Sequence, residues 1–263
     1  MLLNVSRRLG IWLFAAAGAL VLLAAVLAPR TPQPLWYHEF ADRRSWLGIS
    51  NFGDVASNFL FALFGVVGLV FLCGNSSQSH FIERREKWFY FLLFFGLLLT
   101  AAGSAYYHLA PDNVLLVWDR LPMTLIFMPL VAAMVGERLS VKLGLQLLPI
   151  LIGMDLASVL YWSWTETRGA GDLRFYAAVQ VYAVLAILVA SLLPPRYTRT
   201  SDLIVVSFFY VLAKVCEIAD RQIFSLGQVV SGHTLKHLAA GLAGFCILRM
   251  LRKRQPIRAH EAR

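Results

Sequence analysis

The sequence predicts an all-α polytopic membrane protein, with a seven-transmembrane-helix core and one extra N-terminal transmembrane helix. Hydrophobic residues make up 59% of the 263 residues, and the mean hydropathy is +0.65. Charged residues make up only 15%, whereas soluble domains carry about a quarter. The apolar residues also form blocks of roughly 20 residues, the length that crosses a bilayer as a helix.

Eight apolar blocks follow one another along the chain, and each predicts a membrane span. Their ranges are 11–28, 53–73, 88–108, 116–135, 143–163, 174–194, 203–220 and 232–250. We therefore divide the chain into an extra helix (1–30), an outer loop (31–52), a seven-helix membrane domain (53–250) and a basic cytoplasmic tail (251–263). The first block follows Arg7 and Arg8 and has small residues near Ala28, so a cleaved signal peptide is the alternative to the uncleaved span that we favour.

The basic residues of the loops predict the orientation of the chain. With a cytoplasmic N-terminus, 15 of the 24 Lys and Arg residues fall in cytoplasmic segments and seven in outer segments. The positive-inside rule therefore places both termini in the cytoplasm, in an inner membrane if the cell is bacterial. The candidate site residues described below then all lie toward the outer, periplasmic side.

The net charge of +9 does not indicate nucleic-acid binding, because much of the excess lies in segments that flank spans. Such basic flanks usually face anionic lipid headgroups. Six basic residues cluster near the C-terminus: Arg249, Arg252, Lys253, Arg254, Arg258 and Arg263. The three cysteines, Cys73, Cys216 and Cys246, are scattered and odd in number, so they indicate core residues rather than a disulfide framework.

Three histidines at the ends of apolar blocks form the candidate metal site. His233 and His237 are four residues apart and therefore face the same side of a helix, where they can share one ion with His108. Ionisable side chains are costly inside a bilayer, so their presence there indicates function. Catalytic zinc usually takes three protein ligands, lowers the pKa of a bound water and polarises a carbonyl group.

Two further residues supply the remaining chemistry. Asp119 can accept the proton of the water and deliver it to the leaving group. Ser104 lies one helical turn before His108, so its hydroxyl can stabilise a developing oxyanion. Ser57 and Asn58 open another span on the same side, where helix capping and a supporting role in the site are equally good interpretations. Haem is the competing cofactor, but the sequence offers no second histidine pair.

At these residues the chain resembles the alkaline ceramidase family, within the CREST-type superfamily of membrane hydrolases. The family pattern is Ser-Asn at the start of one helix, S-x-x-x-H at the end of the next, an Asp eleven residues later, and H-x-x-x-H opening the last helix. Here these are Ser57-Asn58, Ser104 with His108, Asp119, and His233 with His237, and Leu121-Pro122-Met123 also looks like the ceramidase version. The resemblance covers about residues 42–250, and the chain between the motifs looks more like the bacterial members.

The resemblance implies a seven-helix protein that binds Zn²⁺ through His108, His233 and His237 and hydrolyses the amide bond of a ceramide-like lipid from the bilayer. Asp119 would be the acid and base, Ser104 would assist the oxyanion, and Ser57 would support the site. Animal members also carry an acidic calcium loop, for which Asp42, Trp46 and Asn51 are the only counterparts here. Arg43 and Arg44 in that stretch argue against calcium.

Two other classes of function remain open from the sequence. The first is a receptor or sensor like the adiponectin-receptor-like relatives, with a structural zinc site closed by a fourth protein ligand. The second is a transporter that uses Asp155, Lys214 and Glu217, although no inverted repeat or broken pair of helices supports it. Internal ion pairing among Lys214, Glu217 and Arg221, which share one helix face, is the simpler interpretation of that cluster.

Overall fold

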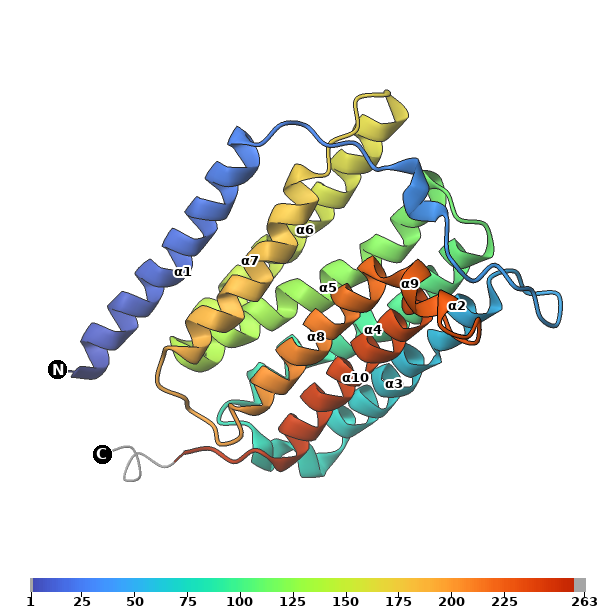
Figure 1. Cartoon of the computed structure of the whole chain (residues 1–263). Helices are drawn as coiled ribbons and strands as arrows, with labels where there is room; N and C mark the ends of the chain where they lie inside the picture. Colours follow the sequence, from blue (N-terminus) through green and yellow to red (C-terminus); the bar gives the residue numbers. More distant parts are fainter. Residues whose placement is uncertain (1, 258–263) are drawn as a thin grey trace.

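The computed structural model describes residues 2–257, with side chains described from residue 7 onwards. This part of the chain is a bundle of α-helices joined by loops and three short 3₁₀ helices (Figure 1). The α-helices are α1 (Leu2–Leu27), α2 (Phe52–Ser57), α3 (Phe59–Cys73), α4 (Lys87–Leu109), α5 (Asn113–Arg138), α6 (Val141–Thr167), α7 (Arg174–Ser191), α8 (Asp202–Ile218), α9 (Asp220–Ser225) and α10 (Gly232–Lys253).

Seven helical segments of the described residues are long and apolar enough to cross a membrane. They are Arg7–Leu27, Phe52–Cys73, Arg84–Leu109, Asn113–Arg138, Val141–Thr167, Arg174–Ser191 and Gly232–Lys253. The predicted all-α polytopic class is therefore confirmed. The predicted span 203–220 corresponds to α8, whose 17 residues stand at the lower limit of the about 17–25 that cross a bilayer.

The order of the helices in space places the two termini at the same end of the bundle (Figure 1). α4 packs between α3 and α5, and α5 also packs against α6 and α7. α10 packs against α8 and α3. α1 packs against α7 at the edge of the bundle. We call the end with the termini the terminal end, and the other the site end.

The second predicted span, 53–73, is divided into two helices at Asn58. The Asn58 side-chain amide donates to the carbonyl oxygens of Asp54 (2.8 Å) and Val55 (3.3 Å), so it competes with the helix backbone for them. The Ser57 hydroxyl also donates to the Asp54 carbonyl, at 3.0 Å. The break separates a short polar helix, α2, from the apolar helix α3.

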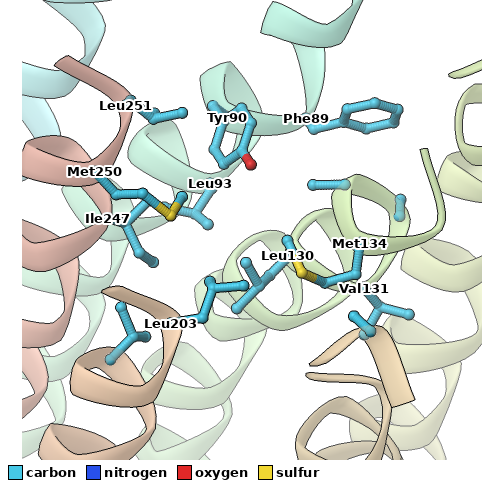
Figure 2. Close-up of a cluster of buried hydrophobic side chains, with 14 of the residues drawn as sticks. Phe89, Tyr90, Leu93, Leu130, Val131, Met134, Leu203, Ile247, Met250 and Leu251 are labelled. Atoms are coloured by element: carbon cyan, nitrogen blue, oxygen red, sulfur yellow. The ribbon is translucent and has the colours of Figure 1, made fainter. Parts of the chain in front are cut away.

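The apolar core lies mainly between α4, α5, α8 and α10, toward the terminal end. Figure 2 shows Phe89, Tyr90 and Leu93 of α4, Leu130, Val131 and Met134 of α5, Leu203 of α8, and Ile247, Met250 and Leu251 of α10. Because lipid is as apolar as these side chains, close packing rather than escape from water holds such helices together.

Arg254 departs from the expectation that it belongs to an exposed basic tail. It follows α10 directly and is only 1% exposed, and its guanidinium forms an ion pair with Glu137 of α5. It also donates to the hydroxyl of Tyr90 (3.3 Å) and the carbonyl of His80 (3.1 Å), and it stacks on the ring of Tyr197 at 4.0 Å. Arg258 and Arg263, the other basic residues predicted for the end of this tail, lie outside the described residues.

We expect Arg254→Ala to lower the free energy of unfolding by about 3–5 kcal/mol, because it leaves the buried Glu137 carboxylate without its partner. Thermal unfolding of the detergent-solubilised protein measures the loss as a lower melting temperature. Lys253→Ala is the matched control, since Lys253 is exposed at the end of α10. Equal melting temperatures for the two variants would contradict the anchoring role of Arg254.

Candidate metal centre

Three imidazole rings meet at the site end of the bundle. His108 lies in the last turn of α4, and His233 and His237 lie in the first two turns of α10. The ring centroids are 4.8–4.9 Å apart in all three pairs, and one ligand atom of each residue lies within 4.8 Å of the others. The three residues are 0–3% exposed. The sequence prediction that these residues come together is confirmed.

The local sequence at the start of α10 fixes two of these rings. The Ser231 hydroxyl caps the helix by accepting from the backbone N–H of Thr234, at 2.9 Å. A Cβ on Gly232 would stand 2.2 Å from the carbonyl oxygen of Cys216, so only glycine lets α10 begin this close to α8. The backbone N–H of His233 donates to Asp220 at 2.8 Å. The first turn of α10 is therefore held on both sides.

A second close approach joins α4 to α5 beside the site. Pro122 has no N–H, so the carbonyl of Trp118, four residues earlier, has no helical hydrogen bond to make with it. Gly103 of α4 lies against that carbonyl, and a Cβ there would stand only 2.1 Å from its oxygen. Ser104 follows Gly103, and Asp119 follows Trp118. The close approach of Gly103 to Trp118 therefore brings Ser104 and Asp119 to facing helices beside the site.

The short helix α2 packs against both α4 and α10, and it orients His237. The Nδ1 of His237 lies 2.9 Å from the hydroxyl of Ser57 and 3.1 Å from the carbonyl oxygen of Asp54. Because a carbonyl oxygen only accepts, this geometry favours a proton on Nδ1 and leaves Nε2 free for an ion. The Asp54 carboxylate accepts from Thr234 (2.7 Å) and Ser231 (3.3 Å).

His108 provides the observation that tests whether a metal fits. Both of its ring nitrogens are buried and have no hydrogen-bond partner among the described residues. A buried imidazole without a partner is costly, and an ion shared with two neighbouring imidazoles would remove that cost for one nitrogen. Two nitrogens on one zinc are at most about 4.2 Å apart, so the group would close slightly around an ion. The residues present therefore fit a metal ion.

Asp119 and Ser104, the predicted catalytic residues, share a cavity with one of the histidines. Both line one cavity of about 420 Å³ together with His237, and they are 9% and 1% exposed. The cavity starts at the site end and continues between α5, α7, α8 and α10 as far as Leu130, Ile187 and Ile247. Its charged residues stand toward the site end, and the remaining lining is mainly apolar, with Thr100, Gln180 and Ser207 as polar members.

Sequence reasoning missed several polar residues of this cavity. Lys236 projects about 100° away from His237 on the helix, which predicts no contact with the site, yet its Nζ lies 3.4 Å from Nε2 of His233, three residues away. It pairs with Glu217 at 2.7 Å, and Lys214 pairs with the same carboxylate at 2.8 Å. The predicted Lys214–Glu217 pair is confirmed. Arg221, predicted to join it, pairs with Glu39 instead.

The predicted outer loop runs across the site end and is held by polar contacts. Tyr37 donates to Glu217 at 3.2 Å, and the backbone N–H of Ala41 donates to Asp220 at 2.9 Å. Asp42, considered above for calcium, is engaged by Arg44, whose guanidinium donates at 2.7 and 2.8 Å and lowers the pKa of the carboxyl. Arg44 also donates to the carbonyl of Val229 just before α10, at 2.7 Å.

Asp155, the remaining acidic residue considered from the sequence, lies away from the metal centre. It is buried in α6, where its carboxylate accepts from Ser158 at 3.4 Å, and it does not line the cavity. Asp155 therefore does not share a cavity with Lys214 and Glu217, as a transport pathway through all three residues would require.

No model of a known protein family matches the chain, and no curated protein matches it.

We expect the purified wild-type protein to hold about one metal ion per chain and the His233→Ala/His237→Ala variant to hold none, because one imidazole does not retain the ion. Elemental analysis by mass spectrometry of detergent-purified, chelator-free protein measures this. His80→Ala is the matched control, since His80 lies at the terminal end against Arg254. Equal metal content in the double variant and the wild type would place the metal elsewhere.

Removal of the Ser57 hydroxyl tests the orientation of His237. Ser57→Ala should weaken metal affinity by about 10- to 100-fold, as removal of a group that orients a ligand typically does. Competition with a chromogenic zinc chelator gives the affinity. Ser158→Ala is the matched control, because Ser158 is also buried and donates to the carbonyl three residues earlier, but lies in α6. An unchanged metal affinity in Ser57→Ala would contradict the role of Ser57 and would mean that the Asp54 carbonyl alone orients His237.

Proposed function

We propose that the protein is a zinc-dependent intramembrane hydrolase that cleaves the amide bond of ceramide or a related N-acyl lipid. The observation that carries the proposal is the position of the three-histidine group, one member of which, His237, lines a mainly apolar cavity within the helix bundle. The resemblance of the motif residues to alkaline ceramidases supports the same reaction.

The shape and lining of the cavity favour a lipid substrate. Its volume of about 420 Å³ falls in the range of about 300–1,000 Å³ typical of small-molecule sites. The charged groups stand toward the site end, and a mainly apolar part continues along α7 and α8, with Gln180 and Ser207 as polar members. A molecule with a polar head, an amide and a long acyl chain matches this order of lining residues along the cavity.

The roles of the residues follow from where they stand. A zinc ion held by His108, His233 and His237 would polarise the substrate carbonyl and lower the pKa of a water molecule. Asp119 shares the cavity with His237, so its carboxylate can take the proton of the attacking water and return it to the leaving nitrogen. Ser104 lines the same cavity, and its hydroxyl can donate to the developing oxyanion. Ser57 orients His237.

The number of ligands separates a hydrolase from a receptor with structural zinc. A structural site is closed by a fourth protein ligand, whereas a catalytic site keeps one position open. Among the described residues the candidate group has three members, and Asp119 is not one of them. This favours the hydrolase. The loop charges predict that both termini are cytoplasmic, and the site lies at the opposite end of the bundle. We therefore further propose that the site faces the outer side of the membrane.

We expect Asp119→Asn to lower amide hydrolysis by about 100- to 10,000-fold while metal content stays unchanged, because the amide cannot take a proton. Release of fatty acid from ceramide and other N-acyl lipids in mixed micelles, quantified by mass spectrometry, measures turnover. Asp112→Asn is the matched control: Asp112 is the exposed N-cap of α5, and asparagine caps a helix equally well.

Full turnover by Asp119→Asn would show that the mechanism is wrong. A wild-type protein that holds its metal ion but releases no fatty acid from any N-acyl lipid would overturn the hydrolase proposal and favour a receptor.

A further inference from the structure

Arg120 stands in the wall of the cavity without a carboxylate partner. It follows Asp119 in α5, is 5% exposed and lines the same cavity as Asp119 and His237. None of the ion pairs formed by residues 7–257 includes it. A buried charge without a partner is costly unless something else stabilises it.

Aromatic rings and one neutral amide hold the guanidinium in place. It stacks over Trp162 at 4.0 Å and over Tyr176 at 4.5 Å, and its Nη2 donates to Oε1 of Gln33 at 2.6 Å. Its Nη1 is buried and has no hydrogen-bond partner within the described part of the chain. Glu166 accepts from Trp162 and from the backbone of Gln33, and does not reach Arg120. The positive charge is therefore fixed in position but not neutralised.

The other cations of the cavity are better compensated. Lys214 and Lys236 share the carboxylate of Glu217. The cavity lining then holds three cations, including Arg120, against two carboxylates, Asp119 and Glu217. The polar end carries an excess of positive charge even before a metal ion is counted, and in a low-dielectric setting this charge acts strongly on a bound group.

We propose that Arg120 is a specificity-determining residue that binds an anionic group, a phosphate or a carboxylate, on the head of the N-acyl lipid. The inference rests on the proposed function for the identity of the lipid but not for the anion site itself. Arginine matches the paired oxygens of both groups, and stacking on aromatic rings orients it in advance. Small movements of the guanidinium from Gln33 would bring its unpartnered nitrogen to the anion.

The test measures binding with amphiphiles that contain no amide, so that hydrolysis plays no part. The probes are dodecyl phosphate, dodecyloxyacetate and the neutral dodecyloxyethanol, titrated calorimetrically into protein in nanodiscs of zwitterionic lipid. We expect the wild type to bind one or both anions about 10- to 100-fold more tightly than the neutral probe, the usual value of a charge-assisted hydrogen bond. The two anionic probes distinguish a phosphate head from a carboxylate head.

Two variants remove the positive charge in different ways. Arg120→Gln deletes it, and Gln33→Glu neutralises it by placing a carboxylate at the position that Nη2 already contacts, so that the ring stacking stays. Both should lose most of the preference for anions and keep their affinity for the neutral probe and their metal content. Arg168→Gln is the matched control, because Arg168 also stacks on a tryptophan, Trp164, but is exposed and does not line the cavity.

Each outcome decides the proposal. Equal binding of anionic and neutral probes by the wild type would overturn it. A preference for anions that survives in folded Gln33→Glu would also overturn it, by placing the anion at the histidines instead. If the preference disappears in Gln33→Glu but the wild type cleaves no N-acyl lipid, the anion site stands and only the proposed hydrolysis fails.

Discussion

The contacts of the short helix α2 are the constraint on which the metal centre depends. Two of the histidines belong to α10 and one to α4, and α2 packs against both helices. Asn51, at its start, donates to the carbonyl of His108 at 2.8 Å, while Ser57, at its end, holds the ring of His237. A six-residue helix thus sets the distance between two long apolar ones, and its Asp54 carbonyl contacts His237 as well as Ser57 and Asn58.

The sequence predicted the fold class and the pairing of His233 with His237 because both follow from strong local signals. Long apolar blocks have few alternatives to a membrane helix, and paired histidines four residues apart must share a helix face. The residues that it missed depend on tertiary structure. Lys236 reaches His233 because the side chain is long, and the pairing of Arg221 with Glu39 depends on a loop contact nearly two hundred residues apart in sequence.

Charged residues near helix ends were the hardest to interpret from the sequence alone. Arg254 follows a run of basic residues that usually faces lipid headgroups, yet it is buried between α10 and α5. Its partner, Glu137, lies more than a hundred residues earlier, and no spacing rule connects them. Composition therefore predicts on which side of a membrane a basic residue lies, but only packing decides whether its charge is exposed or paired.

The cavity stabilises lysine and arginine in different ways, and this difference bears on its chemistry. Lys236 is a compact ammonium close to a candidate metal ligand, and Glu217 compensates its charge directly. Arg120 is planar and more weakly hydrated, so two aromatic rings and Gln33 suffice to keep it buried. A carboxylate beside Lys236 limits its repulsion of an ion at the histidines. The absence of an ion pair at Arg120 leaves its charge available to whatever occupies the cavity. The polar end therefore holds an ion-paired group, Lys214, Lys236 and Glu217, near the histidines and, next to Asp119, an arginine that forms no ion pair with the described residues.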